Sequence, residues 1–168
     1  YVIIGWLPSI LQSMGYSEAQ AGSLHGLLQL ATAAPGLLIP LVLNRFKDQR
    51  AIAALVSLMC AVGAAGFAVM PGQALLWTIL FGFGSGATMI LGLTFIGLRA
   101  SSAHQAAALS GMAQSVGYLL AACGPPLMGK IHDLNGSWLI PLAGVAVLAI
   151  LMAVFGLCAG RNREIASA

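Results

Sequence analysis

The chain is a succession of six apolar runs separated by short polar breaks. The runs cover residues 1–14, 17–43, 51–70, 74–98, 105–128 and 138–158. The last five each hold about 20 residues or more, enough for a helix to cross the roughly 30 Å hydrocarbon core of a bilayer. The first run spans only about 21 Å as a helix, which predicts that its helix begins upstream. The pattern predicts an all-α integral membrane protein, with residues 1–168 as a single six-helix domain.

Local signals mark several helix ends. Ser17 and Gln20 match the capping box, in which the N-cap hydroxyl and the side chain three residues later satisfy each other's backbone N–H groups. Pro35 and Pro40 interrupt the second run, and either can bend or end its helix. The turn at residues 71–73 joins the third run to the fourth. We therefore expect an irregular second helix between well-marked neighbours.

Small and polar residues recur every three or four positions in four of the six runs, so each set shares one helix face. The third and sixth runs carry almost no polar side chain, which predicts that they face lipid. Two runs with a small or polar face are followed by one run almost without polar side chains, and this order occurs twice. The order predicts a 3+3 inverted repeat. The stripes are Tyr1, Gly5, Pro8 and Gln12; His25, Gln29, Thr32 and Gly36; the glycines of the fourth run; and Ser110, Gln114, Gly117, Ala121 and Pro125.

Two glycine patterns predict close packing between helices. Gly82 and Gly86 form a GxxxG, whose missing side chains let two helix backbones approach. Gly124, Pro125 and Gly129 belong to an apolar stretch with two adjacent prolines, a sequence that bundles in lipid tolerate where helices pack or line a cavity. We expect both patterns to serve gating or packing.

Composition excludes a soluble domain. Charged residues make up 7% of the chain, against roughly 25% in soluble proteins. The net charge of +3 is too thinly spread to indicate a nucleic-acid partner. The three cysteines lie far apart in apolar runs and fit packing roles better than a metal site or a disulfide. We predict no cofactor, no metal and no catalytic residue.

The basic residues gather on one side of the predicted membrane. Six of the seven fall in the loop at 44–50, after the fourth run or in the tail at 159–168, and only Lys130 falls on the other side. The positive-inside rule predicts that this side and both chain ends are cytoplasmic. The six are Arg45, Lys47, Arg50, Arg99, Arg161 and Arg163.

Polar side chains inside the runs are the candidate cavity residues. His25 is the only ionisable side chain, other than cysteine and tyrosine, that we place within the membrane, and an intramembrane histidine indicates either function or a neutral hydrogen bond to a neighbouring helix. Gln29 and Gln114 can bind a solute or each other. Tyr1 and Tyr118 can line the cavity or fill the core. Gln12 shares the stripe of Tyr1 and joins the set.

The helix pattern and two short motifs resemble the carboxy-terminal half of a major facilitator superfamily transporter. Residues 124–129 look like the Gly-Pro-x-x-Gly element of its fifth and eleventh helices. Residues 40–50 look like a weak copy of the Gly-x-x-x-Asp-Arg-x-Gly-Arg-Lys loop, in which Pro40, Asn44 and Lys47 replace the motif's first Gly, its Asp and its second Gly. Residues 24–38, 81–89 and the fifth run resemble bacterial cyanate-porter proteins, a group with a relative tied to nitroimidazole export.

The resemblance implies half of a 12-helix fold and a secondary transporter for a small polar or anionic solute in the bacterial inner membrane. Its implied partners are the lipid bilayer, the small-molecule substrate and an amino-terminal half, for which a homodimer of the fragment can substitute. The alternatives are an accessory membrane subunit or an intramembrane enzyme. Residues 83–86 place Phe where a rhomboid protease needs the first glycine of Gly-x-Ser-Gly, which argues against that enzyme class.

Overall fold

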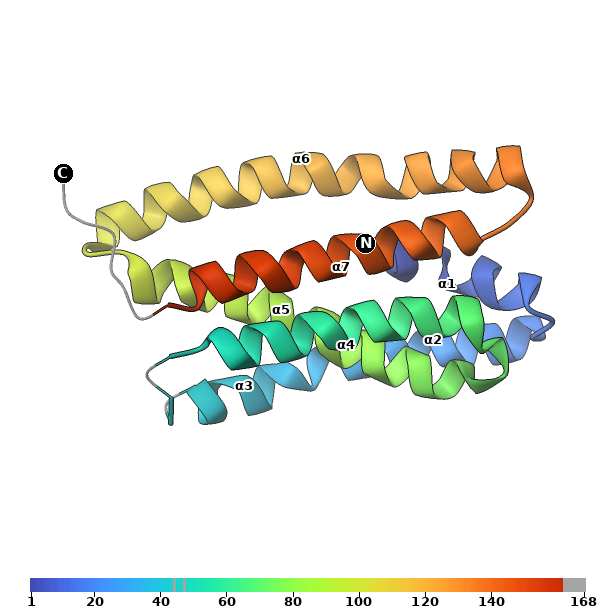
Figure 1. Ribbon diagram of the computed structural model, residues 1–168, viewed down its shortest axis with the longest axis horizontal. Coiled ribbons are helices and arrows are strands. Elements are labelled where there is room, and N and C mark those ends of the chain that lie inside the picture. Colours follow the sequence, from blue (N-terminus) through green and yellow to red (C-terminus); the bar gives the residue numbers. More distant parts are fainter. Residues whose placement is uncertain (44, 47, 162–168) are drawn as a thin grey trace.

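Helices make up most of the computed structural model (Figure 1). The structure describes residues 1–43, 45–46 and 48–161, and for Val42 it describes the backbone alone. The described part contains no strand. Its elements are α1 (Val2–Ser13), α2 (Glu18–Ala33), α3 (Pro35–Leu43), α4 (Arg50–Val69), the 3-10 turn η1 (Pro71–Gln73), α5 (Ala74–Arg99), α6 (Ala103–Asn135) and α7 (Leu139–Ala159).

Five spans are long and apolar enough to cross a membrane: α2 with most of α3, α4, η1 with α5, α6, and α7. α1 is a shorter apolar helix of 12 residues. This arrangement confirms the all-helical membrane bundle that the hydrophobic pattern predicts.

The second run begins and bends where its sequence indicates. The Ser17 hydroxyl accepts from the Gln20 backbone N–H at 3.3 Å, and Gln20 Oε1 accepts from the Ser17 N–H at 2.9 Å, which confirms the capping box. Pro35 separates α2 from α3, because proline removes a backbone donor and crowds the preceding turn. Pro40 lies inside α3 without ending it.

The fifth run departs from its predicted bounds of 105–128. α6 continues through Pro125 and Pro126 to Asn135, and Gly136 then ends it in the left-handed conformation, with φ of 66°. In apolar surroundings a break at the prolines would leave several backbone groups unpaired, whereas continuing the helix leaves few. The loss of two N–H donors is therefore the smaller cost, and the proline pair does not stop the helix.

The helices of the two predicted sets of three pack in a crossed arrangement. α2 packs against α5, α1 packs against α6, and α4 and α7 pack against each other. The second helix of each set of three thus contacts the first helix of the other set. α1 and α5 occupy equivalent places and run in opposite directions, since α1 runs towards η1 and α5 runs away from it.

The burial of α4 and α6 reverses the prediction from polarity. The sequence predicts a lipid-facing α4, but half of its membrane-length window is buried, against none of that of α6. Small residues explain the difference. At Gly63 and Gly66 the α4 backbone comes close to Phe81 and Trp77 of α5, so a helix with few polar side chains packs at the centre.

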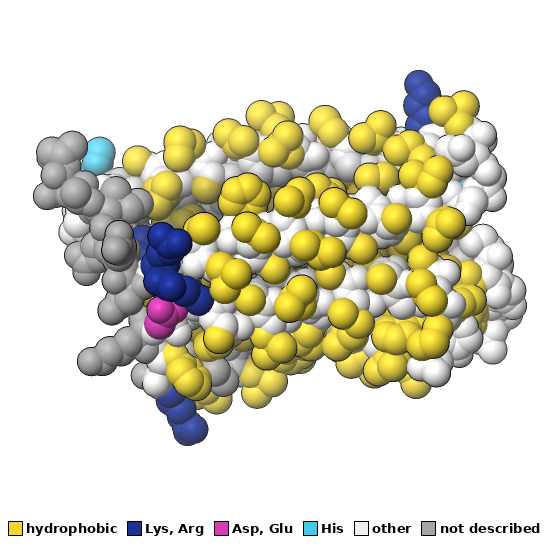
Figure 2. Space-filling model, in the orientation of Figure 1, with side chains coloured by type: hydrophobic (Ala, Val, Ile, Leu, Met, Phe, Trp, Pro, Cys, Tyr) yellow, Lys and Arg dark blue, Asp and Glu magenta, His cyan; other side chains and the backbone are white. Residues whose placement is uncertain are grey.

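The surface of the bundle is apolar along its length and basic at one end. Figure 2 shows hydrophobic side chains over the visible face, with dark blue Lys and Arg side chains mainly at one end and a smaller dark blue group at the opposite end. Arg45, Arg50, Arg99 and Arg161 lie in or beside the chain segments at this end, which we call the basic end. Lys130 lies near the other end of α6, which we call the far end. This is the distribution that the sequence predicts.

Candidate functional site

A cavity of about 630 Å³ lies between α1, α2, α4, α5, α6 and α7. Its walls are mostly apolar, and its residues come chiefly from α5, α6 and α7. A volume of roughly 300–1,000 Å³ with few polar groups is typical of small-molecule sites. The lining is Tyr1, Ile4, Thr32, Cys60, Phe81, Ser85, Thr88, Met89, Gly92, Leu93, Ile96, Ala113, Gln114, Gly117, Tyr118, Val145, Leu148, Ala149 and Met152.

The hydroxyl groups of this cavity present oxygen acceptors. Ser85 donates its hydrogen to the Gly82 carbonyl at 3.0 Å, and Thr88 donates to the Ser85 carbonyl at 2.9 Å. Thr32 on α2 donates to the Leu28 carbonyl at 2.7 Å. Because each hydroxyl hydrogen is committed to its own helix, the oxygens keep lone pairs for a donor on a solute.

Gln114, Tyr118 and Tyr1 form the polar rim on the side of α6. Gln114 Nε2 donates to the Ser110 hydroxyl at 2.6 Å, which leaves its Oε1 as an acceptor. The rings of Tyr1 and Tyr118 meet edge to face, with centroids 6.2 Å apart. The structure thus brings together three of the six predicted cavity residues, from positions more than 100 residues apart.

The other three predicted cavity residues lie outside this lining. His25 and Gln29 are one turn apart on α2, with their Nε2 atoms 3.4 Å apart. His25 is half-buried, and its Nδ1 is a buried atom with no hydrogen-bond partner in the described residues. Gln12 is exposed near the end of α1. His25 and Gln29 thus form a polar pair on α2, outside the lining of this cavity.

Gly82 and Gly86 bring α5 against α2. A Cβ added at Gly82 would lie 2.8 Å from the Ala31 Cβ, and one added at Gly86 would overlap the Thr32 carbonyl oxygen. Both approaches are closer than a van der Waals contact, so only glycine fits at positions 82 and 86. The GxxxG therefore does what its pattern predicts, which is to let two backbones meet.

The glycine and proline element of α6 meets an aromatic side chain of α1. The indole N–H of Trp6 donates to the Pro125 carbonyl at 2.8 Å. A Cβ at Gly129 would lie 2.6 Å from Trp6 Cζ2, whereas one at Gly124 would meet only Val2, at 3.2 Å. Trp138, the residue before α7, packs against Trp6 with ring centroids 5.4 Å apart, and its ring stacks on that of His132 with centroids 4.1 Å apart.

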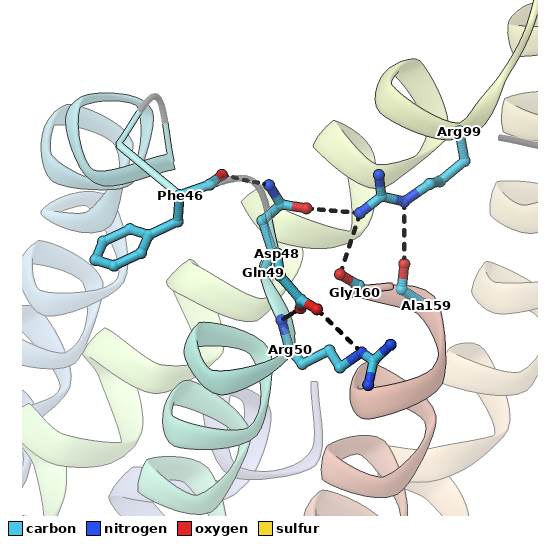
Figure 3. A network of polar contacts seen from close by, with 7 residues as sticks. All are labelled: Phe46, Asp48, Gln49, Arg50, Arg99, Ala159 and Gly160. Carbon is cyan, nitrogen blue, oxygen red and sulfur yellow. Dashed lines mark hydrogen bonds and ion pairs between the residues drawn. The ribbon is translucent and has the colours of Figure 1, made fainter. Parts of the chain in front are cut away.

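Arg99 joins three segments at the basic end (Figure 3). Its Nη2 donates to Gln49 Oε1 at 2.6 Å and to the Gly160 carbonyl at 3.2 Å. Its Nε donates to the Ala159 carbonyl at 3.2 Å. Gln49 donates in turn to the Phe46 carbonyl at 2.8 Å. The end of α5, the loop before α4 and the end of α7 are thereby linked.

The basic loop contributes a separate ion pair. Arg50 Nε lies 3.3 Å from Asp48 Oδ2, and both side chains are about half exposed. Arg45 is exposed in a turn. Lys47, the third predicted loop residue, lies outside the described residues.

Sequence reasoning overlooked Ser85, Thr88 and Trp6. The two hydroxyls lie three residues apart on α5, the helix spacing that could have identified them, but the glycines around them dominate that stretch. Trp6 gives no signal in its own run, because its partner lies 119 residues away. The sequence also led us to interpret Arg99 only as a charge that orients the chain in the membrane. It did not predict the hydrogen bonds of Arg99 to Gln49, Ala159 and Gly160.

Comparisons with known proteins agree on one family. A family model described as Major Facilitator Superfamily matches residues 1–167. The chain is 82% identical over 165 residues to the 2-nitroimidazole transporter of Escherichia coli (strain K12), a match that covers 98% of this chain and 42% of that protein. No solved structure gives a significant match.

Two further relatives carry other names. The chain is 53% identical over 112 residues to a putative anionic 4-hydroxy-benzoate permease of Thauera aromatica, covering 67% of this chain and 68% of that protein. It is 30% identical over 149 residues to the cyanate transport protein CynX of Escherichia coli (strain K12), covering 88% of this chain and 38% of that protein. The chain thus spans about two fifths of the length of the nitroimidazole and cyanate proteins.

Proposed function

The chain belongs to the major facilitator superfamily, and on that premise we propose that it is the carboxy-terminal half of a secondary transporter working by alternating access. The family consists of transporters, which also supports the expectation that the protein is not an enzyme. The observation that carries the proposal is the cavity of about 630 Å³, where Gln114, Ser85 and Thr88 supply acceptors among apolar walls.

The proposal of a half rests on length and on packing. The relatives named for nitroimidazole and cyanate are more than twice as long as this chain. The crossed helix pairs support a three-plus-three unit, and superfamily transporters combine two such units around a midplane site. We therefore propose an amino-terminal half as the partner, with a homodimer of this unit as its only substitute.

The proposed solute is small and polar or anionic, as nitroimidazoles and cyanate are. The relatives' names support this class, and so do the dimensions of the cavity. The acceptor oxygens of Ser85, Thr88 and Gln114 suit an N–H or O–H donor on the solute. The lining contains no Lys, Arg or His, so an anionic solute would take its opposite charge from the other half.

The proposed setting is the bacterial inner membrane, with the basic end in the cytoplasm. The separation of Arg45, Arg50, Arg99 and Arg161 from Lys130 supports this orientation. Single cysteines introduced at Arg45 and at Leu134 provide a test in intact cells. We expect a membrane-impermeant maleimide to label position 134 from outside and to label position 45 only after the cells are opened. Labelling of position 45 in intact cells would reverse the orientation.

Transport is tested with the full-length protein in proteoliposomes. We expect saturable flux of at least one of three labelled solutes: 2-nitroimidazole, cyanate and 4-hydroxybenzoate. Residues 1–168 reconstituted alone should give the flux of empty vesicles, because alternating access moves one half against the other. Saturable flux by the isolated chain in its monomeric form, verified by crosslinking, would overturn the proposal of a half. Failure of the full-length protein with every small polar solute would overturn the proposed activity.

A further inference from the structure

A second cavity, of about 440 Å³, lies between α5, α6 and α7 at the basic end. Phe95 of α5 and Leu109 and Ala113 of α6 supply apolar walls. Two lining residues are charged, Arg99 and Arg161. Arg99 is the last residue of α5, and Arg161 lies two residues beyond α7, so both charges lie at the membrane-surface end of the cavity. We call this cavity the basic crevice.

The positive charges of the basic crevice form no ion pair with a carboxylate of the described residues. Arg99 donates only to neutral oxygens, those of Gln49, Ala159 and Gly160 (Figure 3). Neither Arg99 nor Arg161 forms an ion pair within residues 1–43, 45–46 and 48–161. Arg50, by contrast, pairs with Asp48 at 3.3 Å. A partly buried charge is stable only when an opposite charge or strong hydrogen bonds compensate it.

The hydrogen bonds of Arg99 hold its guanidinium in one place and leave part of it free. Nε and Nη2 are occupied, and Nη1 makes no hydrogen bond to the described part of the chain. The side chain also lies over the Phe95 ring, with Cζ 5.7 Å from the ring centroid. Phe95 is therefore a wall of the crevice and a support for the charge at its end.

We propose that the basic crevice binds an anionic phospholipid, with its phosphate at Arg99 and Arg161 and an acyl chain along the apolar walls. Basic pockets between transmembrane helices are recognised sites for anionic lipid head groups. An inorganic anion would use the two arginines but would leave the apolar walls unfilled. A neutral lipid would fill the walls but would not compensate the arginines. An amphiphile with both parts fits the whole crevice.

The loose packing of α6 gives a lipid its access. None of the membrane-length window of α6 is buried, and the helix contacts α5 and α7 less than α4 does. Leu109 and Ala113 therefore border a crevice that opens to the side rather than a closed core. A bilayer lipid can enter such a space laterally without crossing the protein.

The test uses the full-length protein in detergent, with lipids added singly. Native mass spectrometry counts bound molecules of phosphatidylglycerol, phosphatidylcholine and dioleoylglycerol, and inorganic phosphate serves as a competitor. We expect preferential retention of one phosphatidylglycerol. Arg161→Gln should weaken that binding about fivefold, as expected for one basic residue at a membrane surface. Arg161 is exposed and its side chain forms no hydrogen bond or ion pair with the described residues, so this variant should fold.

Matched variants separate the crevice from the general charge of the protein. Arg45→Gln removes the same charge at the same end, outside the crevice, and should leave the retained lipid unchanged. Leu109→Trp should fill the crevice and reduce retention. Met112→Trp places the same ring three residues away on an exposed part of α6 and should not.

Three results would overturn the proposal. They are equal retention of phosphatidylcholine, equal effects of Arg45→Gln and Arg161→Gln, and complete displacement of the lipid by millimolar phosphate. The last would identify a site for a free anion. Because the readout is lipid retention, a failure here leaves the proposed transport activity untouched.

Discussion

The indole Nε1 of Trp6 donates a hydrogen bond of 2.8 Å to the carbonyl oxygen of Pro125. The two residues lie 119 positions apart in the chain, on α1 and α6, and few other contacts join these helices. The same indole ring covers Gly129 one turn further along α6. The glycine and proline element of α6 is therefore fitted to one aromatic side chain. The fit makes Gly129 a packing position.

Gly129→Ala should destabilise the protein. The added Cβ would lie 2.6 Å from Trp6 Cζ2, and the rigid indole can move only by giving up its bond to Pro125. Overpacking of this kind costs about 1–3 kcal/mol. The melting temperature in detergent measures the effect. Gly117→Ala, on the same helix with no atom within 4 Å of its added Cβ, should be neutral or slightly stabilising. Equal melting temperatures for the two variants would contradict the fit.

Gly86→Ala should destabilise the protein more than Gly97→Ala on the same helix. Its Cβ would overlap the backbone carbonyl of Thr32, which belongs to α2 and has no rotamer by which to escape. The two helices must separate, and we expect about 1–3 kcal/mol of lost stability. Gly97→Ala on the same helix has free space and serves as the control. A melting temperature for Gly86→Ala within error of that control would show that α2 and α5 are not in close contact.

The sequence predicts local features of this fold and misses distant ones. Hydrophobic run lengths, the capping box at Ser17 and the basic end all follow from residues close together in the chain. The burial of α4 does not, because it depends on which helices its small residues Gly63 and Gly66 meet. The passage of α6 through Pro125 and Pro126 likewise depends on the surroundings of the helix and not on proline itself.

The same limit applies to the candidate site. Gln114, Tyr118 and Tyr1 are identified by stripe position, and the structure gathers them at one cavity. Thr32 belongs to a predicted stripe. Ser85 and Thr88 were overlooked because they lie in a glycine-rich stretch that was interpreted as a helix-packing pattern. In the sequence Arg99 is only a basic residue in a predicted loop. Its partners Gln49 and Gly160 lie 50 and 61 residues away along the chain. Such pairings require the folded chain.

Arg99→Lys should lower stability although it keeps the charge. A guanidinium reaches Gln49, Ala159 and Gly160 from two nitrogens in a fixed plane, whereas an ammonium on a flexible stem lacks that geometry. Loss of one or two neutral hydrogen bonds corresponds to about 1–2 kcal/mol, measured as the melting temperature in detergent. Arg45→Lys, at an exposed turn, is the matched change. Identical behaviour of the two lysine variants would mean that the arginine at 99 acts only as a charge.

Gln114→Ala should impair transport in the full-length protein without reducing its level in the membrane. The amide donates to Ser110 and keeps its oxygen for a solute, and a single neutral hydrogen bond corresponds to about a two- to tenfold rise in KM. Ser115→Ala changes the next residue on α6, which does not line the cavity, and should transport normally. Ser57 is unsuitable as a control, because its side chain is buried in α4. Normal KM for Gln114→Ala would remove Gln114 from the proposed solute contacts.

His25→Gln should flatten the pH dependence of transport. His25 Nε2 lies 3.4 Å from Gln29 Nε2, and the other ring nitrogen, Nδ1, is buried without a partner in the described residues. A buried polar atom left unpaired costs stability, so such an atom in a native structure calls for a functional explanation. Histidine is also the side chain that most readily gains or loses a proton near neutral pH. We therefore propose that His25 takes part in coupling.

The measurement is the transport rate of the full-length protein from about pH 5 to pH 8, the range in which histidine ordinarily titrates. Glutamine keeps a neutral hydrogen-bonding side chain of similar size, so loss of the pH response with retained expression would isolate the proton from the packing. His104→Gln changes an exposed histidine at the start of α6 and should leave the profile as it was. If His25→Gln keeps the wild-type rate at every pH, His25 instead serves as a packing residue bonded to Gln29.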